Sequence, residues 1–156
     1  MFKRIARSQS GMTLIEIMVV ITIIGLIATI VTVNVMGRMD QAKVSTTKTQ
    51  IKNLESALDA FRADNGFYPS TEQGLMSLIE KPTSGRSASN YPRGGYLKGD
   101  SIPKDTWGGE FIYFSPGTHG NNPYEITSLG ADGEEGGEDS NEDINSWEIG
   151  SSKKNQ

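Results

Sequence analysis

The chain of 156 residues contains no cysteine, which excludes disulfide bonds. Small domains outside the cytoplasm usually need disulfides, a bound metal or assembly to supplement a small hydrophobic core. A metal ion, assembly with other subunits, or both are therefore expected if this domain lies outside the cytoplasm. There is also only one histidine, His119. A single histidine without cysteines excludes a usual zinc site and leaves no catalytic triad.

Basic residues are missing from a long part of the chain. Between Asp105 and Ser152 there is no lysine or arginine, against eleven acidic residues. The formal net charge of −4 and the pI of about 5.0 argue against a nucleic-acid-binding protein, which usually carries a basic excess. The few early positive charges, Lys3, Arg4 and Arg7, stand at the beginning of the chain. This distribution indicates a membrane-orientation signal at the start and a cation site in the acidic C-terminal third.

Residues 12–36 form an apolar run in which Glu16 is the only charge. A helix of this length, at about 1.5 Å per residue, would cross a hydrocarbon core of about 30 Å. The basic residues before it would stay in the cytoplasm and place residues 37–156 outside. A cleavable signal peptide is disfavoured because the run is too long and no small-residue cleavage site follows it. A plain anchor with Glu16 reaching the interface stays open, although a carboxylate within an apolar span costs about 2 kcal/mol or more and should have a partner.

The sequence at the start of this run, Gly-Met-Thr-Leu-Ile-Glu at 11–16, resembles the processing site of type IV prepilins and pseudopilins. The resemblance implies that residues 1–11 are a cytoplasmic leader and that a prepilin peptidase cuts between Gly11 and Met12. It also implies methylation of the new N-terminus on Met12 and pairing of Glu16 with the N-terminal amine of a neighbouring subunit. Two opposite charges in a low dielectric each cost much alone and far less when paired.

The helical pattern continues beyond the apolar run. The spacing of apolar residues between 38 and 64 predicts an amphipathic helix whose stripe consists of Val44, Ile51, Leu54, Leu58 and Phe61. Asn65-Gly66 is a plausible stop because glycine readily adopts positive φ. We therefore expect one helix from about Met12 to Asp64. Pilins commonly have a proline where this chain has Val33, so a straighter helix is predicted.

The remaining chain is rich in turn-forming residues and predicts a small antiparallel sheet. Residues 111–114 and 124–129 are expected to be strands joined by a hairpin-type connection over 115–123. Residues 72–80 are expected to form a short helix. A small sheet packed against the long helix makes an α+β fold. His119 lies in the connection and is expected to be an exposed turn residue.

Four stretches of this region, 64–82, 94–99, 103–120 and 128–147, resemble the major pseudopilins (protein G family) of type II secretion systems. The resemblance implies a pilin-like fold and a non-enzymatic subunit in the bacterial inner membrane with a periplasmic domain. Such subunits polymerise into a periplasmic pseudopilus that drives secretion of folded proteins across the outer membrane. The implied partners are other copies of the chain, minor pseudopilins, the inner-membrane assembly platform and the prepilin peptidase, with no nucleic acid and no small-molecule substrate. Thr106 stands where this family usually has proline, which is expected only to loosen a turn.

Acidic residues are crowded into the segment 132–143, where they number seven: Asp132, Glu134, Glu135, Glu138, Asp139, Glu142 and Asp143. A solvated acidic loop is the usual fate of such a run, and that interpretation stays open on composition alone. Calcium prefers six to eight hard oxygen ligands, which carboxylates, amides and carbonyls supply. The alternation of Asp139, Asn141 and Asp143 is typical of the start of an EF-hand loop, but Ile144 occupies the glycine position of that motif. An EF-hand is therefore excluded.

The resemblance to the major pseudopilins implies that this loop binds a structurally required calcium ion. The expected ligands are Asp132, Asp139 and the carbonyl of Leu129, followed by Asn141 and Asp143. Calcium binding to the folded form would supply stability that the missing disulfides do not.

Other functions are less well supported by the sequence. A type IV pilin or a competence pseudopilin has the same architecture, but the ectodomain motifs favour the secretion family. A minor pseudopilin is a weaker alternative because such subunits are often changed at the glutamate that is intact here. A membrane-anchored periplasmic enzyme or calcium-binding module would require the prepilin-type site to be a coincidence. No catalytic constellation and no nucleotide-binding motif is present in the sequence, so we expect no enzymatic activity.

Overall fold

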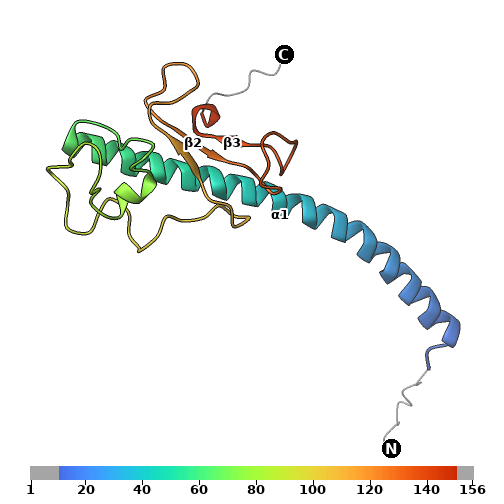
Figure 1. Cartoon of the computed structure of the whole chain (residues 1–156). Coiled ribbons are helices and arrows are strands. Elements are labelled where there is room, and N and C mark those ends of the chain that lie inside the picture. Colours follow the sequence, from blue (N-terminus) through green and yellow to red (C-terminus); the bar gives the residue numbers. More distant parts are fainter. Residues whose placement is uncertain (1–10, 151–156) are drawn as a thin grey trace, which may run out of the picture. The chain divides into compact units, whose positions relative to one another are not determined.

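The computed structural model describes residues 11–150, except for the side chains of residues 29–36. In chain order it contains α1 (Leu14–Asn65), the 3₁₀-helix η1 (Leu75–Leu78), strands β1 (Ile112–Phe114), β2 (Glu125–Ser128) and β3 (Ile144–Asn145), and the 3₁₀-helix η2 (Ser146–Glu148). The chain divides into two compact units, Met1–Met39 and Asp40–Gln156, which are described separately. Figure 1 shows the order of these elements along the chain.

Helix α1 confirms the predicted single helix, with bounds that differ from the expected ones by one or two residues. The helix ends at the predicted stop. Gly66 adopts a φ of 80°, and its N–H donates to the carbonyl of Arg62 at 2.7 Å, as is common after the last helical residue. The backbone is helical without interruption through residue 33. The side chain of Val33 lies outside the described residues, and the straightness of the helix stays a prediction.

The predicted apolar stripe of α1 is the centre of the hydrophobic core. Ile51, Leu54, Leu58 and Phe61 are fully buried, and Val44 is partly buried against the same cluster. Burial of a large aliphatic or aromatic side chain contributes roughly 1.5–3 kcal/mol. The stripe is therefore the main attachment of the helix to the rest of the second unit.

The sheet that covers this stripe is antiparallel, with the strand order β1-β2-β3. Tyr113 lies opposite Ile126, and Ser128 lies opposite Ile144. Phe111, Tyr113, Ile126 and Ile144 are buried in the same core cluster as the helix stripe, and the sheet lies along α1 in Figure 1. The α+β fold predicted from the sequence is thus confirmed.

Two expectations about local structure need correction. The segment expected to form a short helix over 72–80 contains only the four-residue 3₁₀-helix η1. Strand β3 was not predicted, because a strand of two residues is too short to show an alternating pattern. The other two strands lie within the predicted segments.

The loop between η1 and β1 is held to η1 by close backbone contacts. The N–H groups of Tyr96 and Leu97 both donate to the carbonyl of Leu78, at 2.6 and 3.0 Å. Gly95 has a φ of 70°, and a Cβ at this position would lie 2.5 Å from the carbonyl oxygen of Ile79. Only glycine permits both the left-handed backbone and this approach.

Thr106 does not loosen its turn, as was expected from its replacement of proline. Its hydroxyl contacts the Thr47 hydroxyl at 2.8 Å and donates to the Lys43 carbonyl at 3.1 Å, both on α1. Its N–H, which proline would lack, faces the Thr47 hydroxyl at 3.4 Å. The expectation was wrong because it considered only the turn and not the helix on which the turn packs.

Candidate assembly and metal sites

The first turn of α1 holds the predicted assembly residue. The N–H of Thr13 donates to Oε2 of Glu16 at 3.4 Å, and the N–H of Glu16 donates to the Thr13 hydroxyl at 3.3 Å. This reciprocal pair is a capping box, in which a threonine and a glutamate three residues later satisfy two helix N–H groups. Both distances are long, so the interactions are weak. Sequence reasoning missed this role of Glu16, although the Thr-x-x-Glu spacing signals it.

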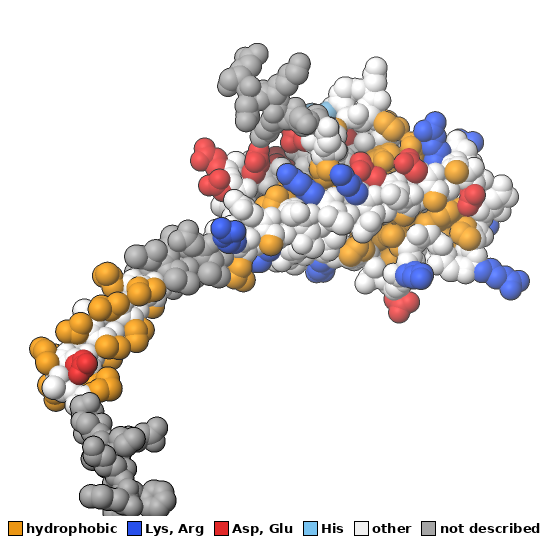
Figure 2. All heavy atoms as spheres, turned by 180° about the vertical axis from the view of Figure 1, so that it is seen from behind, with side chains coloured by type: hydrophobic (Ala, Val, Ile, Leu, Met, Phe, Trp, Pro, Cys, Tyr) orange, Lys and Arg blue, Asp and Glu red, His pale blue; other side chains and the backbone are white. Residues whose placement is uncertain are grey.

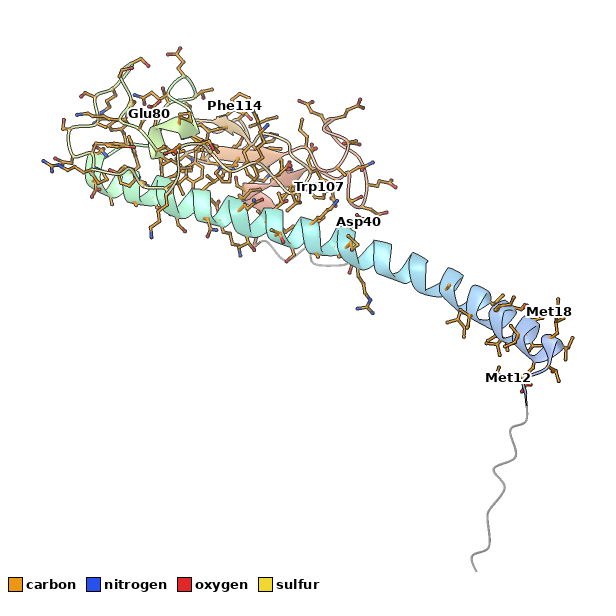
Figure 3. All side chains as sticks on the ribbon, turned by 90° about the horizontal axis from the view of Figure 1, so that it is seen from below. Met12, Met18, Asp40, Glu80, Trp107 and Phe114 are labelled. Atoms are coloured by element: carbon orange, nitrogen blue, oxygen red, sulfur yellow. The ribbon has the colours of Figure 1, made fainter. Side chains whose placement is uncertain are left out.

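Large apolar side chains on the first part of α1 are exposed on every side of the helix. Between Met12 and Ile27 the large hydrophobic residues have exposed fractions from 42% for Val20 to 79% for Leu14. Figure 2 shows hydrophobic side chains gathered over the first part of α1 on the face in view, and in Figure 3 Met12 and Met18 mark the beginning of this segment. Within the part of the chain whose side chains are described, no helix has the length and apolar character needed to cross a bilayer.

Part of the predicted membrane segment and most of the predicted leader lie outside the residues whose side chains the structure describes. The predicted span over 12–36 includes the undescribed side chains at 29–36, and residues 1–10 of the predicted leader lie outside the described residues. The predicted cleavage site is described. Gly11 and Met12 are both exposed, and nothing lies within 4 Å of a Cβ placed on Gly11.

The acidic loop in the second unit is folded by backbone contacts. The N–H of Ala131 donates to the carbonyl of Ser140 at 2.9 Å. Gly130 and Gly137 have φ values of 65° and 88°, and a Cβ on Gly137 would lie 2.5 Å from the Asn141 carbonyl oxygen. The glycines thus allow the two ends of the loop to approach closely.

The predicted calcium ligands are arranged along this loop. Asp132, Asp139 and Asn141 are exposed, while Leu129 immediately follows β2 and leads into the loop. Asp139 has a φ of 57°, which is uncommon for a residue with a side chain. Glu134, Glu135 and Glu138 in the same loop are also exposed.

Asp143 differs from the other acidic residues because it is partly buried. Its Oδ2 accepts the N–H of Gly136 at 3.0 Å, while its Oδ1 is buried without a hydrogen-bond partner among the described residues. A buried carboxylate oxygen without a partner is costly, and a cation would relieve that cost. No three histidine, cysteine, aspartate or glutamate side chains converge into a ready metal cage within residues 11–150. The oxygen atoms that this loop offers are carboxylate, amide and carbonyl oxygens, which are the kinds of ligand that calcium accepts in proteins.

A buried carboxylate that sequence reasoning missed lies beside the β1–β2 connection. Glu125 on β2 is 2% exposed at its side chain, whereas His119 is 64% exposed. Oε2 of Glu125 accepts the Thr118 hydroxyl at 2.8 Å and lies 3.1 Å from Nδ1 of His119. Oε1 accepts the N–H of His119. His119 also stacks on Trp147, with ring centroids 4.5 Å apart. It is thus exposed, as predicted, but also fixed by its neighbours.

Burial alone would raise the pKa of Glu125, because it disfavours the charged form. The hydrogen bonds from the backbone and side chains of His119 and Thr118 outweigh this effect and lower the pKa to about 2. Glu125 is therefore ionised at neutral pH and organises the connection around it. The signal in the sequence is an acidic residue inside a predicted strand, where an apolar or neutral residue is usual.

A second buried carboxylate, Asp105, organises the turn that follows it. Its Oδ1 accepts the N–H groups of Trp107 and Gly109 at 3.0 and 2.7 Å, and its Oδ2 accepts the Ser128 hydroxyl at 2.6 Å. The turn is thereby tied to the end of β2.

Two family descriptions match this chain. Residues 34–147 match "Type II secretion system (T2SS), protein G", and residues 6–32 match "Prokaryotic N-terminal methylation motif". The first match covers most of the second unit, and the second covers the predicted processing site and the glutamate of the first turn. The two together agree with the division into an apolar helical segment and a folded domain.

Similar proteins carry the same description. The chain is 50% identical over 142 residues to the type II secretion system core protein G of Pseudomonas aeruginosa, covering 91% of this chain and 97% of that protein. It is 45% identical over 143 residues to the protein of that name in Vibrio cholerae, covering 92% and 94%. The crystal structure of the major pseudopilin from the type 2 secretion system of enterohaemorrhagic Escherichia coli superposes with a TM-score of 0.62 at 39% identity, covering 73% of this chain and 94% of that one. The chain belongs to the type II secretion system protein G family.

Proposed function

We propose that this chain is the precursor of the major pseudopilin of a type II secretion system, a structural subunit rather than an enzyme. One observation supports this function above all. A helix begins with an exposed apolar segment that contains a single carboxylate, Glu16, and the same helix continues as the core of a compact domain. Such a segment needs apolar surroundings, either lipid or the matching segments of other copies.

The proposed pathway begins in the inner membrane, with the basic leader in the cytoplasm and the folded domain in the periplasm. A prepilin peptidase cuts between Gly11 and Met12, and Met12 is methylated. The apolar segments then leave the lipid and pack against one another in the centre of a filament. Repeated contacts between different surfaces of identical subunits do not close into a ring and so extend a filament. The growing pseudopilus, together with minor pseudopilins and the assembly platform, moves folded proteins towards the outer membrane.

Glu16 is the proposed register residue of this assembly. An ionised carboxylate within packed apolar helices is costly unless an opposite charge is close. The amine created on Met12 of a neighbouring subunit would supply that charge only at the correct axial stagger. The capping box with Thr13 keeps the carboxylate near the start of its own helix, where an incoming amine must arrive.

We also propose that the acidic loop holds a calcium ion. The residues that would hold it are Asp132, Asp139, Asn141 and Asp143, together with the carbonyl of Leu129. The unpartnered, buried Oδ1 of Asp143 supports this proposal. Calcium would supply two positive charges to a loop that contains no basic residue. The chain's own contribution is the glycine-dependent backbone that brings both ends of the loop together.

Co-expression of the full chain with a prepilin peptidase tests the proposed function. Intact-mass analysis of the membrane fraction should show a protein that begins with methylated Met12 only when the peptidase is present. A Gly11→Val variant should stay uncut, whereas Gly25→Val, which changes a glycine inside the apolar segment, should still be cut. A Glu16→Gln variant should be processed normally but yield at least tenfold less sheared filament in an otherwise complete secretion system. An intact Met1 terminus, or normal filament yield from Glu16→Gln, would contradict the proposal.

A further inference from the structure

We propose that the outer edge of β1 binds an extended, basic segment of a partner protein by strand addition. This interaction goes beyond the filament role and does not depend on it. β1 is an edge strand, since the sheet order is β1-β2-β3. An edge strand presents unpaired backbone N–H and C=O groups that another chain can pair with.

The register shows which backbone groups face outward. The N–H of Ile126 donates to the Ser146 hydroxyl at 3.1 Å, so Ile126 is turned away from β1. The opposite residue, Tyr113, therefore makes no backbone hydrogen bonds to β2, because such groups alternate along an antiparallel pair. Tyr113 and Phe111, two residues earlier, direct their backbone N–H and C=O groups to the outer edge.

Both ends of this outer edge are already occupied. The carbonyl of Gly109 accepts the N–H of Asp105 at 2.9 Å. The carbonyl of Ser115 accepts the N–H of Thr71 at 3.3 Å, and the N–H of Ser115 donates to the Thr71 hydroxyl at 2.8 Å. The two outward-facing residues between these ends have no backbone partner among the residues that the structure describes. The open edge is thus a defined gap of two residues.

A cavity of about 850 Å³ opens along this gap. Its lining includes the apolar residues Leu75, Ile102 and Phe111 and the acidic residues Glu72 and Glu110. Leu75 and Phe111 are buried, Ile102 is half-buried, and both glutamates are exposed. In Figure 3, Phe114 marks the last residue of β1. The cavity therefore combines apolar and acidic lining residues next to the unpaired backbone.

These features define the chemistry of the occupant. Two N–H and two C=O groups at strand spacing are complementary to an extended polypeptide, and the apolar lining residues accommodate small side chains at alternate positions. Among the charged lining residues, Lys104 lies 3.9 Å from Glu110, whereas Glu72 forms no ion pair within residues 11–150. The net charge of the lining is negative. A segment in which lysine or arginine alternates with small apolar residues fits the gap best.

The test uses the ¹⁵N-labelled full chain in detergent micelles with saturating calcium, and a seven-residue acetylated peptide of alternating lysine and valine as the probe. Binding should shift the amide resonances of Phe111 and Tyr113 and slow their hydrogen exchange at least tenfold. The amides of Ile112 and Phe114, which already face β2, should exchange at unchanged rates. A Glu72→Gln/Glu110→Gln double variant should weaken binding about fivefold without changing the melting temperature, because both side chains are exposed.

Two control peptides and the binding position complete the test. A glutamate–valine peptide, and a lysine–valine peptide N-methylated on the amides that would face β1, should both bind at least tenfold more weakly. Equal binding of either control would overturn strand addition, as would the absence of binding at millimolar peptide. Shifts confined to the acidic loop 132–143 would also overturn it. Stronger binding of a peptide with the sequence of residues 151–156 would replace the proposed occupant with a second copy of this chain.

Discussion

Replacement of the buried carboxylate Glu125 by glutamine should destabilise the folded domain in a pH-dependent way. At neutral pH the ionised side chain accepts hydrogen bonds from Thr118 and from both the backbone and the ring of His119. Glutamine has nearly the same shape but carries no charge, and its amide nitrogen cannot accept a hydrogen bond. The variant therefore weakens these contacts and leaves at least one donor without its acceptor.

The size of the destabilisation caused by Glu125→Gln follows from the lowered pKa. A fall from the ordinary value of 4.5 to about 2, at about 1.36 kcal/mol per pH unit, corresponds to an upper limit of about 3 kcal/mol. The side chain of His119, which contacts the carboxylate, is 64% exposed, and screening by solvent reduces the effect. We therefore expect a loss of about 1.5–2 kcal/mol at pH 7. For a domain of this size the melting temperature should fall by roughly 5–10 °C.

The sign of the pH dependence follows from the direction of the shift. Because the pKa of Glu125 is lower in the folded than in the unfolded chain, its contribution is complete above about pH 4.5 and is lost as the pH falls towards about 2. Thermal unfolding of the full chain in detergent, followed by near-UV circular dichroism at pH 7, 4.5, 3 and 2, measures this effect. The difference in stability between the wild type and Glu125→Gln should shrink over the lower part of this range.

Glu110→Gln provides the matched control. Its side chain is 86% exposed, and its ion pair with Lys104 spans 3.9 Å, so its loss should change stability by less than about 0.5 kcal/mol at any pH. If the difference in stability between the wild type and Glu125→Gln stays constant from pH 7 to pH 2, the explanation from the lowered pKa is wrong. If Glu125→Gln unfolds like the control at pH 7, the buried hydrogen bonds have no net effect on stability.

Three further changes should alter stability measurably in thermal unfolding of the full chain. Calcium should raise the melting temperature of the wild type, by a stabilisation of about 2.7 kcal/mol at a hundredfold excess over Kd, and should do so for Glu135→Gln but not for Asp132→Ala. An equal shift in all three proteins would refute the proposed site. Gly95→Ala should lower the free energy of unfolding by roughly 3 kcal/mol, because a Cβ would add left-handed backbone strain and collide with backbone carbonyls. A near-neutral result would contradict the observed loop path. Thr106→Val should lower the free energy of unfolding by about 1–2 kcal/mol, because it leaves the buried hydroxyl of Thr47 without its partner. The control Thr46→Val, at an exposed position, should be nearly neutral. Equal effects of the two variants would show that the contact of Thr106 with α1 is unimportant.

The long helix and the core stripe could be predicted from the sequence because both rest on local periodicity. The apolar residues from Val44 to Phe61 recur at helical spacing, and burial of one face follows from that spacing. Strand β3 could not be predicted in this way. It is two residues long, and its position depends on pairing with β2 rather than on its own pattern. The two predicted strands are confirmed because each contains enough alternating or β-branched residues to be recognised from its own sequence.

The candidate sites differ in the same way: residues with a local signal could be predicted, whereas residues defined by contacts with distant parts of the chain could not. Glu16 was singled out because a charge inside an apolar run is a local anomaly, while Glu125 was missed because its partners come from a connection whose path the sequence does not specify. The contact between Thr47 and Thr106 joins residues 59 positions apart and also could not be predicted. For the acidic loop, composition indicated oxygen ligands, but only the fold shows that Asp143 is the residue with a buried and unpartnered oxygen.

The proposed assembly role of Glu16 is physically compatible with its place in the capping box. Before processing, the nitrogen of Met12 belongs to a peptide bond and carries no charge, so the carboxylate can only accept the N–H of Thr13, at a long 3.4 Å. A weak interaction of this kind orients the side chain without satisfying it. Under the proposed function, cleavage creates an amine, and a neighbouring subunit can then offer a charge that the capping interaction does not replace. A stronger internal partner would remove the advantage of pairing between subunits, whereas no partner would leave the carboxylate free to turn away from the start of the helix. The weak cap thus suits the proposed role, in which Glu16 is held in position in the single subunit and neutralised only in the filament.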